Sequence, residues 1–180
     1  MKKFVVIGID QGLASCGYGV LRFKVDKNGV VSFDKVLDFG VIKTTAKKST
    51  PERLVYIRNR IQALIKDNKA IGIACEKLFF TPPKPGNRNK SSSIIPTNMV
   101  SGIIQLLAGE NNLIFQEFVP STVKKTITGN GKATKDDMIS TIPKILNIGE
   151  GKIKIEHEAD ALSIGYTLGM KLKFKEDSDE

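Results

Sequence analysis

The sequence predicts an α/β fold in which helices flank a mixed five-stranded sheet. Three apolar, strand-like runs follow one another between residues 4 and 42, as in an antiparallel meander. Two more, at 71–76 and 113–119, each follow a helical pattern, and strands reached through a helix usually run parallel to a neighbour. A length of 180 residues suits one domain. We assign residues 1–175 to a single domain and expect 176–180 to be a disordered acidic tail.

The three N-terminal strands are predicted from their apolar content and from one turn. Residues 4–10 are too continuously apolar for a strand with one solvated face, which indicates a buried strand. A second strand is expected at 18–25 and a third within 30–42. Between them lies Asp-Lys-Asn-Gly at 26–29, whose Asn-Gly pair favours the positive φ angles of a primed hairpin turn.

Helices are predicted from capping signals followed by apolar residues at helical spacing. Ser49-Thr50-Pro51-Glu52 combines a capping box with a proline in the first turn, and apolar residues recur at helical intervals from 54 to 65. Four more helices are expected: 97–108 with Thr97 as its cap, 120 to Gly129, one capped at Thr134, and 157–172. In the helix at 97–108, the apolar residues Met99, Ile103 and Leu106 could belong to the core or to a dimer interface.

Composition narrows the range of partners. Lysine and arginine number 28 against 19 acidic residues, a net charge of +9, which favours nucleic acid over an anionic membrane as the partner. No apolar stretch approaches the ~20 residues needed to cross a bilayer, and the N-terminus carries no signal-peptide pattern. Cys16 and Cys75 lack metal-ligand spacing and are expected to be reduced, so we predict a cytoplasmic protein with no membrane association.

Four polar residues stand where a metal site could form. Asp10 and Glu76 each end an apolar run, while His157 and Asp160 are one helical turn apart. A carboxylate at the end of a buried strand is costly to desolvate unless a cation or another partner meets it. Other readings are a turn-forming Asp10, a Glu76 paired with a basic residue, and an ordinary helix-terminal His157. Glu156, four residues before Asp160, is a reserve ligand.

Residues 81–96 form a segment that we call the basic arm. It is rich in proline, glycine and serine, and it carries Lys84, Arg88 and Lys90 but no acid. This composition is typical of a loop, which could simply be solvated or could close on DNA phosphates.

The element order resembles the ribonuclease H-like fold, and four motifs resemble those of the RuvC family of Holliday-junction resolvases. They lie in the family's order and span residues 4 to about 170. The motifs are Asp10-Gln11-Gly12 with Gly17-Tyr18-Gly19-Val20, Glu76-Lys77-Leu78-Phe79, the lysine- and glycine-rich 123–135, and His157-Glu158-Ala159-Asp160-Ala161-Leu162.

The resemblance implies a homodimeric, metal-dependent endonuclease that resolves four-way DNA junctions by paired cuts. It assigns two Mg²⁺ or Mn²⁺ ions per active site to Asp10, Glu76, His157 and Asp160. His157 could instead orient or deprotonate the attacking water. Lys135 joins the catalytic set, and the expected DNA-binding residues are Phe79, Lys84, Arg88, Lys90, Lys124 and Lys132. Phe79 would stack on an unpaired base, although it could also be a core residue.

Three departures from the family pattern indicate a divergent branch, for which a phage origin is one option. Gln11 replaces the usual proline, which we expect to affect turn rigidity more than chemistry. His157 replaces an aspartate found in many members, and the basic arm is longer than in typical bacterial members. The resemblance therefore assigns no branch-migration partner.

Three rival functions remain to be weighed. One is a related ribonuclease H-like nuclease acting on other branched DNA or on structured RNA, and another is a junction-binding module without catalysis. The retention of every acidic position argues against the second. An actin-like ATPase or sugar kinase would need a second lobe, which 180 residues do not provide.

Overall fold

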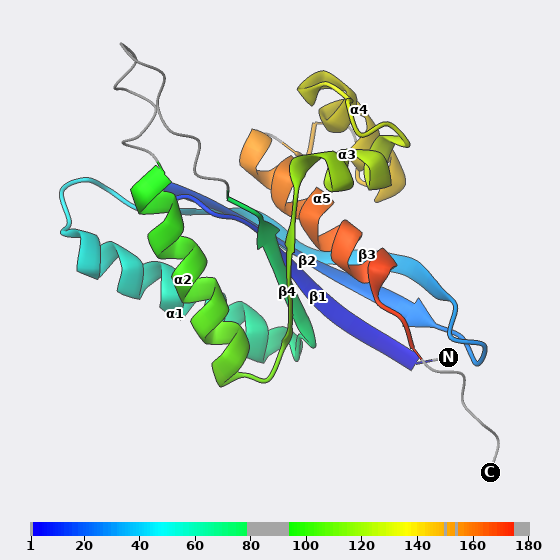
Figure 1. Cartoon of the computed structure of the whole chain (residues 1–180), viewed down its shortest axis with the longest axis horizontal. Coiled ribbons are helices and arrows are strands. Elements are labelled where there is room, and N and C mark those ends of the chain that lie inside the picture. Colours follow the sequence, from blue (N-terminus) through cyan, green and yellow to red (C-terminus); the bar gives the residue numbers. More distant parts are fainter. Residues whose placement is uncertain (1, 79–93, 150, 154, 175–180) are drawn as a thin grey trace.

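The computed structural model describes residues 2–78, 94–149, 151–153 and 155–174 (Figure 1). Five strands form one sheet in the order β3-β2-β1-β4-β5. The strands are β1 (Lys2–Asp10), β2 (Ser15–Val25), β3 (Val31–Lys43), β4 (Gly72–Glu76) and β5 (Ile114–Phe118). The helices are α1 (Thr50–Asn68), α2 (Ile94–Glu110), α3 (Pro120–Thr128), α4 (Lys135–Ile145) and α5 (Glu156–Lys171).

The strand directions confirm the predicted mixed sheet. β1 pairs antiparallel with β2, and β2 antiparallel with β3, whereas β4 runs parallel to both β1 and β5. β2 starts at Ser15 rather than at residue 18, because its first residues already pair with β3, beginning at Lys43. Our prediction of a primed turn at 26–29 was wrong. Within this segment Gly29 alone has a positive φ, at 76°, whereas the predicted turn requires a positive φ at Asn28 as well. The Asp26 carboxylate holds this turn instead, accepting the backbone N–H groups of Asn28 and Val30 at 2.9 Å each.

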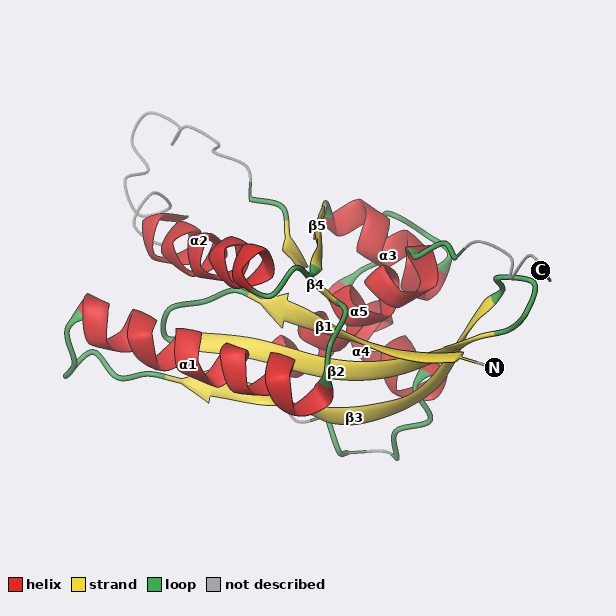
Figure 2. Ribbon diagram, turned by 90° about the horizontal axis from the view of Figure 1, so that it is seen from below, coloured by secondary structure: helices red, strands yellow, loops and turns green. Residues whose placement is uncertain are grey.

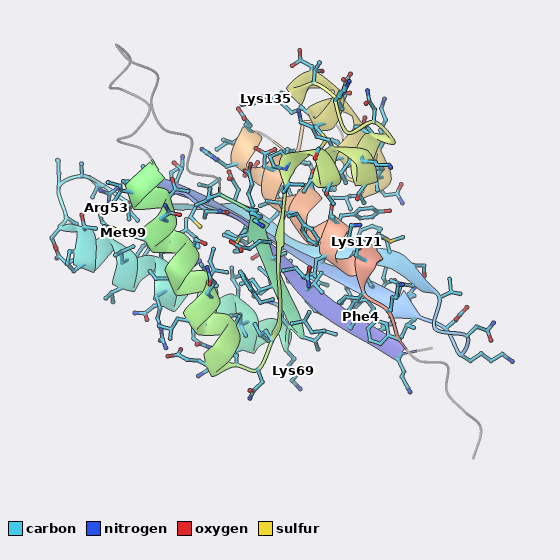
Figure 3. The ribbon with its side chains drawn as sticks, in the orientation of Figure 1. Phe4, Arg53, Lys69, Met99, Lys135 and Lys171 are labelled. Carbon is cyan, nitrogen blue, oxygen red and sulfur yellow. The ribbon has the colours of Figure 1, made fainter. Side chains whose placement is uncertain are left out.

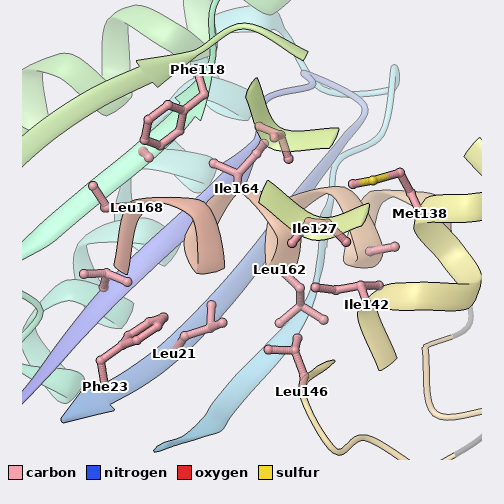
Figure 4. Packing of buried hydrophobic residues seen from close by; sticks show 14 of the residues in the cluster. Leu21, Phe23, Phe118, Ile127, Met138, Ile142, Leu146, Leu162, Ile164 and Leu168 are labelled. Carbon is pink, nitrogen blue, oxygen red and sulfur yellow. The ribbon is translucent and has the colours of Figure 1, made fainter. Parts of the chain in front are cut away.

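Helices cover both faces of the sheet (Figures 1 and 2). α1 and α2 lie on one face, and α5 with α3 and α4 lies on the other. Each face has its own apolar core. The core under α1 and α2 includes Ile7, Ile57, Ile61 and Ile104, all with no exposed surface. The core under α5 contains residues of β1, β2, α3, α4 and α5, among them Leu21, Phe23, Ile142, Leu162 and Leu168 (Figure 4).

Both cysteines are buried in the core under α1 and α2. Cys16 and Cys75 have no exposed surface, and neither forms a disulfide. Burial raises the pKa of each thiol to about 12. They are therefore structural apolar groups, as the sequence predicted for reduced cysteines.

Helix starts agree with the capping signals at α1 and α4 but not at α2. Glu52 accepts the Ser49 backbone N–H at 2.9 Å, and Asp137 accepts that of Thr134 at 2.8 Å. α2 begins at Ile94, so Thr97 is not its cap, and the last three residues of the basic arm are helical rather than loop. A proline in the first turn is compatible with this early start, because its missing N–H would have no helical partner there.

One side of α2 remains outside the core. Val100, Ile104 and Leu107 are buried against the sheet, whereas Met99 (Figure 3) and Leu106 are 42% and 57% exposed. Ile103 is partly buried against the core. The structure thus places Met99 and Leu106 on the surface and leaves them available for an interface.

α5 packs unusually close to β1 and β2, because glycines face it. A Cβ atom on Gly8 would lie 2.1 Å from the Ala161 carbonyl oxygen, and one on Gly17 would lie 2.1 Å from the His157 carbonyl oxygen. No side chain larger than hydrogen fits between these backbones. The N-terminal turns of α5 are therefore brought directly over the end of β1, which carries Asp10.

Candidate active site

Strand periodicity places Asp10 and Glu76 on the same face of the sheet. On β1, Val6 packs in the core under α5 while Ile7 packs in the opposite core. Side chains alternate between faces, so Asp10, four residues after Val6, points toward α5. On β4, Ala74 likewise packs under α5, which puts Glu76 on that side. Since β1 and β4 are parallel neighbours, their two terminal carboxylates lie at the same edge of the sheet.

The first turns of α5 add an imidazole and a third carboxylate. His157 and Asp160 lie three residues apart and face the same pocket as Asp10 and Glu76. His157 Nδ1 is 2.5 Å from Asp10 Oδ2, a direct hydrogen bond between α5 and β1. The Asp10 side chain is 18% exposed and that of His157 is 43% exposed, so the pair sits at the wall of an open pocket.

The pocket has a volume of about 450 Å³ and a mixed lining. Its polar groups are Asp10, Glu76, Lys124, Lys135, Glu156, His157 and Asp160. Its apolar wall consists of Pro120, Val123, Met138, Ile139 and Ile164, contributed by α3, α4 and α5. The predicted catalytic and metal-binding residues thus line a single pocket, together with an apolar wall that the motifs did not reveal.

Burial and mutual repulsion dominate the electrostatics of the carboxylates. Burial, and then the charge of Asp10, raise the pKa of Asp160 to about 6. The same two causes, in the same order, raise the pKa of Glu76 above its ordinary value. Lys135 opposes both shifts. A negative site that is costly to ionise fully is one that a divalent cation stabilises.

Two lysines line the pocket. Lys135 (Figure 3) forms an ion pair with Glu156, and this contact is the main cause of the raised pKa of the lysine. Glu156, which we considered as a reserve ligand, is therefore engaged by a cation of the protein itself. Lys124 also lines the pocket. Lys132 is exposed in the turn between α3 and α4 and does not line it.

The donor set fits a divalent cation, although its present arrangement is not a finished coordination sphere. Within the described ranges, no three His, Cys, Asp or Glu side chains are grouped closely enough to hold a metal ion. Asp10 Oδ2 is hydrogen-bonded to His157 instead. Carboxylate oxygens are nevertheless the ligands that magnesium and manganese prefer, and four carboxylate side chains line this pocket, of which Glu156 is paired with Lys135.

Gln11 makes a contact that we did not predict. We expected it to affect turn rigidity more than chemistry; its side chain is buried, with 5% of its surface exposed, and bonds to the backbone of Glu76. An amide side chain directly after a strand-terminal carboxylate was the signal available in the sequence. Four other predicted residues, namely Phe79, Lys84, Arg88 and Lys90, lie outside the described residues, as does the tail at 176–180.

Comparison with known proteins identifies relatives over nearly the whole chain. The sequence model of the family described as crossover junction endodeoxyribonuclease RuvC matches residues 6–168. The chain is 32% identical to the crossover junction endodeoxyribonuclease RuvC of Alkaliphilus metalliredigens over 160 residues, which cover 89% of each protein. It is 36% identical to the protein of that name from Rickettsia akari over 163 residues, 91% of this chain and 95% of the relative.

Solved structures agree with the fold. The Thermus thermophilus RuvC structure superimposes with a TM-score of 0.73 at 26% identity, over 91% of this chain and 92% of that one. A second structure of that protein, in complex with Holliday junction substrate, gives a TM-score of 0.76 at 24% identity, over 95% and 99% of the two chains. These likenesses confirm the predicted ribonuclease H-like fold class.

Proposed function

The chain belongs to the RuvC family of crossover junction endodeoxyribonucleases, and we propose that it resolves four-way DNA junctions by metal-dependent hydrolysis of phosphodiester bonds. The observation that carries this proposal is the convergence of Asp10, Glu76, His157 and Asp160 on one pocket beside two lysines. The net charge of +9 supports a polyanionic substrate. DNA as substrate and the two disulfide-free cysteines favour a cytoplasmic location. Within the described part of the chain, none of the helices has the length and apolarity that a bilayer-spanning segment requires.

Asp10, Glu76 and Asp160 are the proposed ligands of two Mg²⁺ or Mn²⁺ ions. Bound ions of this kind neutralise phosphate charge and lower the pKa of an attacking water. Asp10 carries the charge that acts on the pKa of both Glu76, on the neighbouring strand, and Asp160, on α5. It is therefore the residue best placed to serve both ions.

His157 has two candidate roles. As a ligand it would favour manganese, because imidazole nitrogen is a softer donor than carboxylate oxygen. As a general base it would rely on its contact with Asp10. If Nδ1 donates its proton to Asp10, the neutral ring carries its lone pair on Nε2, which can accept a proton from water.

The lysines are proposed to contact the DNA backbone. Lys135 and Lys124 line the pocket, so their ammonium groups can approach a phosphate held there. Lys132, the basic arm and Phe79 would extend this contact, with Phe79 stacking on an unpaired base at the junction. Productive resolution requires paired cuts in strands of like polarity, and one active site provides one cut. A two-fold symmetric homodimer matches this need.

The exposed side of α2 is the proposed dimer interface. Ile95, Met99 and Leu106 are 61%, 42% and 57% exposed and recur at intervals of four and seven residues, so they share one face. An exposed apolar face on a helix is typical of association with another surface. Size measurement of the wild type and of Leu106→Glu tests this: a dimer that the substitution does not weaken excludes this face.

A cleavage assay with four substrates tests the proposal. Synthetic four-way junction, flap, linear duplex and RNA–DNA hybrid are incubated with Mg²⁺, with Mn²⁺, or with a chelator. We expect metal-dependent nicking of the junction that leaves 5′-phosphate and 3′-hydroxyl ends. Asp10→Asn should bind the junction normally and cut it orders of magnitude more slowly, since it removes charge and keeps shape.

The same assay separates the rival functions. Preferred cleavage of the flap or the hybrid indicates a related ribonuclease H-like nuclease whose substrate is not the four-way junction. Tight junction binding without cleavage in either metal indicates a binding module. Asp10→Asn cutting at the wild-type rate excludes Asp10 from the active site.

A further inference from the structure

The pairing of β1 with β4 ends one residue before the two carboxylates. The last partners are Ile9 and Cys75, so Asp10 and Glu76 lie beyond the ladder. On its other side, β4 stays paired with β5 to its end, through Glu76 and Phe118, and Lys77 N–H then donates to the Phe118 carbonyl at 2.9 Å. Toward β1, the backbone of Glu76 therefore needs a different partner.

The Gln11 side chain is that partner. Its Nε2 donates to the Glu76 carbonyl oxygen at 2.6 Å, and its Oε1 accepts the Glu76 backbone N–H at 3.1 Å. The amide thus reproduces the donor and acceptor pair of a peptide group and continues the sheet for one more position. The contact joins residues that are 65 positions apart in the chain; the Gln11 side chain is buried and Glu76 is partly buried.

We propose that Gln11 is a positioning residue that fixes the Glu76 carboxylate relative to that of Asp10. The two carboxylates are carried on separate strands, and the negative charge of Asp10 acts on that of Glu76. Nothing in the β1–β4 ladder restrains the strand ends beyond Ile9 and Cys75. Two hydrogen bonds from the residue next to Asp10 to the residue that carries the other carboxylate supply this restraint.

This inference rests on the proposed function, in which both carboxylates hold divalent cations. Residues that orient a ligand without touching the ion typically contribute about 10- to 100-fold to metal affinity or activity. Gln11 acts through the backbone of Glu76 rather than through its carboxylate. We therefore expect the lower end of that range.

Gln11→Met and Gln62→Met form a matched pair for the test. Methionine is similar in size to glutamine and makes neither amide hydrogen bond. Gln62 also forms two side-chain hydrogen bonds, at 2.9 and 3.1 Å, with Asn111, but these join α1 to the turn after α2, and Gln62 lines no part of the active-site pocket. Comparable losses of stability are expected from both variants, whereas only Gln11→Met should alter the active site.

Three measurements are made on the full chain. Calorimetric titration with Mn²⁺ alone should show about tenfold weaker binding in Gln11→Met and no change in Gln62→Met. Junction affinity in chelator should be equal in all three proteins. Hydrogen exchange at the Glu76 amide should be slow in the wild type and faster in Gln11→Met.

Each outcome decides a different point. Unchanged Mn²⁺ affinity in Gln11→Met, or an equal loss in both variants, overturns the positioning role. Fast hydrogen exchange at the Glu76 amide of the wild type also overturns the positioning role. This measurement needs no variant, so it decides the question even if Gln11→Met does not fold. A wild type that neither binds Mn²⁺ nor cuts the junction contradicts the proposed function instead, whatever the Glu76 exchange shows.

Discussion

Replacement of Gly8 by alanine tests whether the close packing of α5 on β1 sets the geometry of the active site. The new Cβ would lie 2.1 Å from the Ala161 oxygen and 2.2 Å from the Gly165 nitrogen, both backbone atoms of α5. Because non-bonded atoms rest roughly 3–4 Å apart, α5 must move away by about 1 Å or more. Overpacking of this kind costs about 1–3 kcal/mol of unfolding free energy.

The same displacement should slow catalysis. His157 and Asp160 move with α5 while Asp10 stays on β1, and a shift of about 1 Å in a catalytic group can cost roughly 100-fold in rate. Single-turnover cleavage of a four-way junction and urea denaturation measure the two effects. Gly109→Ala is the control, since Gly109 is exposed in α2 and an added Cβ would meet no atom within 4 Å beyond the adjoining backbone of its own helix. Gly109→Ala should keep the wild-type cleavage rate and gain up to about 1 kcal/mol of unfolding free energy. Wild-type rate and stability in Gly8→Ala would refute the reasoning.

Three further predictions concern the site and its substrate. His157→Asp should raise the Mg²⁺ rate relative to the Mn²⁺ rate if His157 is a ligand, and an unchanged ratio with retained activity favours the water-orienting role. In chelator, the unfolding free energy should fall as pH rises from about 4 to about 6. The pKa of native Asp160 is raised from 3.8 to about 6, so in this range the folded protein keeps a proton that the unfolded chain has released. The unfolding free energy of Asp160→Asn, measured by denaturation, should not show this fall. Neutralising the three basic residues of the basic arm should flatten the salt dependence of junction binding by up to roughly 3 units of log–log slope, and equal slopes would show that the arm does not touch DNA.

The sequence predicted the sheet and the polar residues of the pocket because both depend on local patterns. Apolar runs and capping signals are read over a few residues, and the strand ends at Asp10 and Glu76 follow directly from them. The His157 and Asp160 pair follows from helical spacing. The structural matches to RuvC confirm the fold class, whereas the extent of the domain and the roles of individual site residues stay predictions.

Long-range contacts were the part that local patterns did not reveal. The bond from Gln11 to Glu76 spans 65 positions, and its existence depends on where the β1–β4 ladder ends. The apolar wall that includes Met138 and Ile139 depends on how α4 packs near α5. The turn at 26–29 was predicted from its Asn-Gly pair, but the Asp26 side chain offered its backbone N–H groups a competing partner.

The burial of both cysteines makes the protein suitable for selective labelling at an introduced cysteine. Thiolates rather than thiols react with maleimides and similar reagents, and a pKa of about 12 together with full burial leaves Cys16 and Cys75 unreactive in the native state. The chain has no other cysteine. A single cysteine introduced on the surface would therefore take up a fluorophore or spin label selectively, with the natural thiols left in place. Labels on exposed positions of α2 could then report the distance between two copies of the chain.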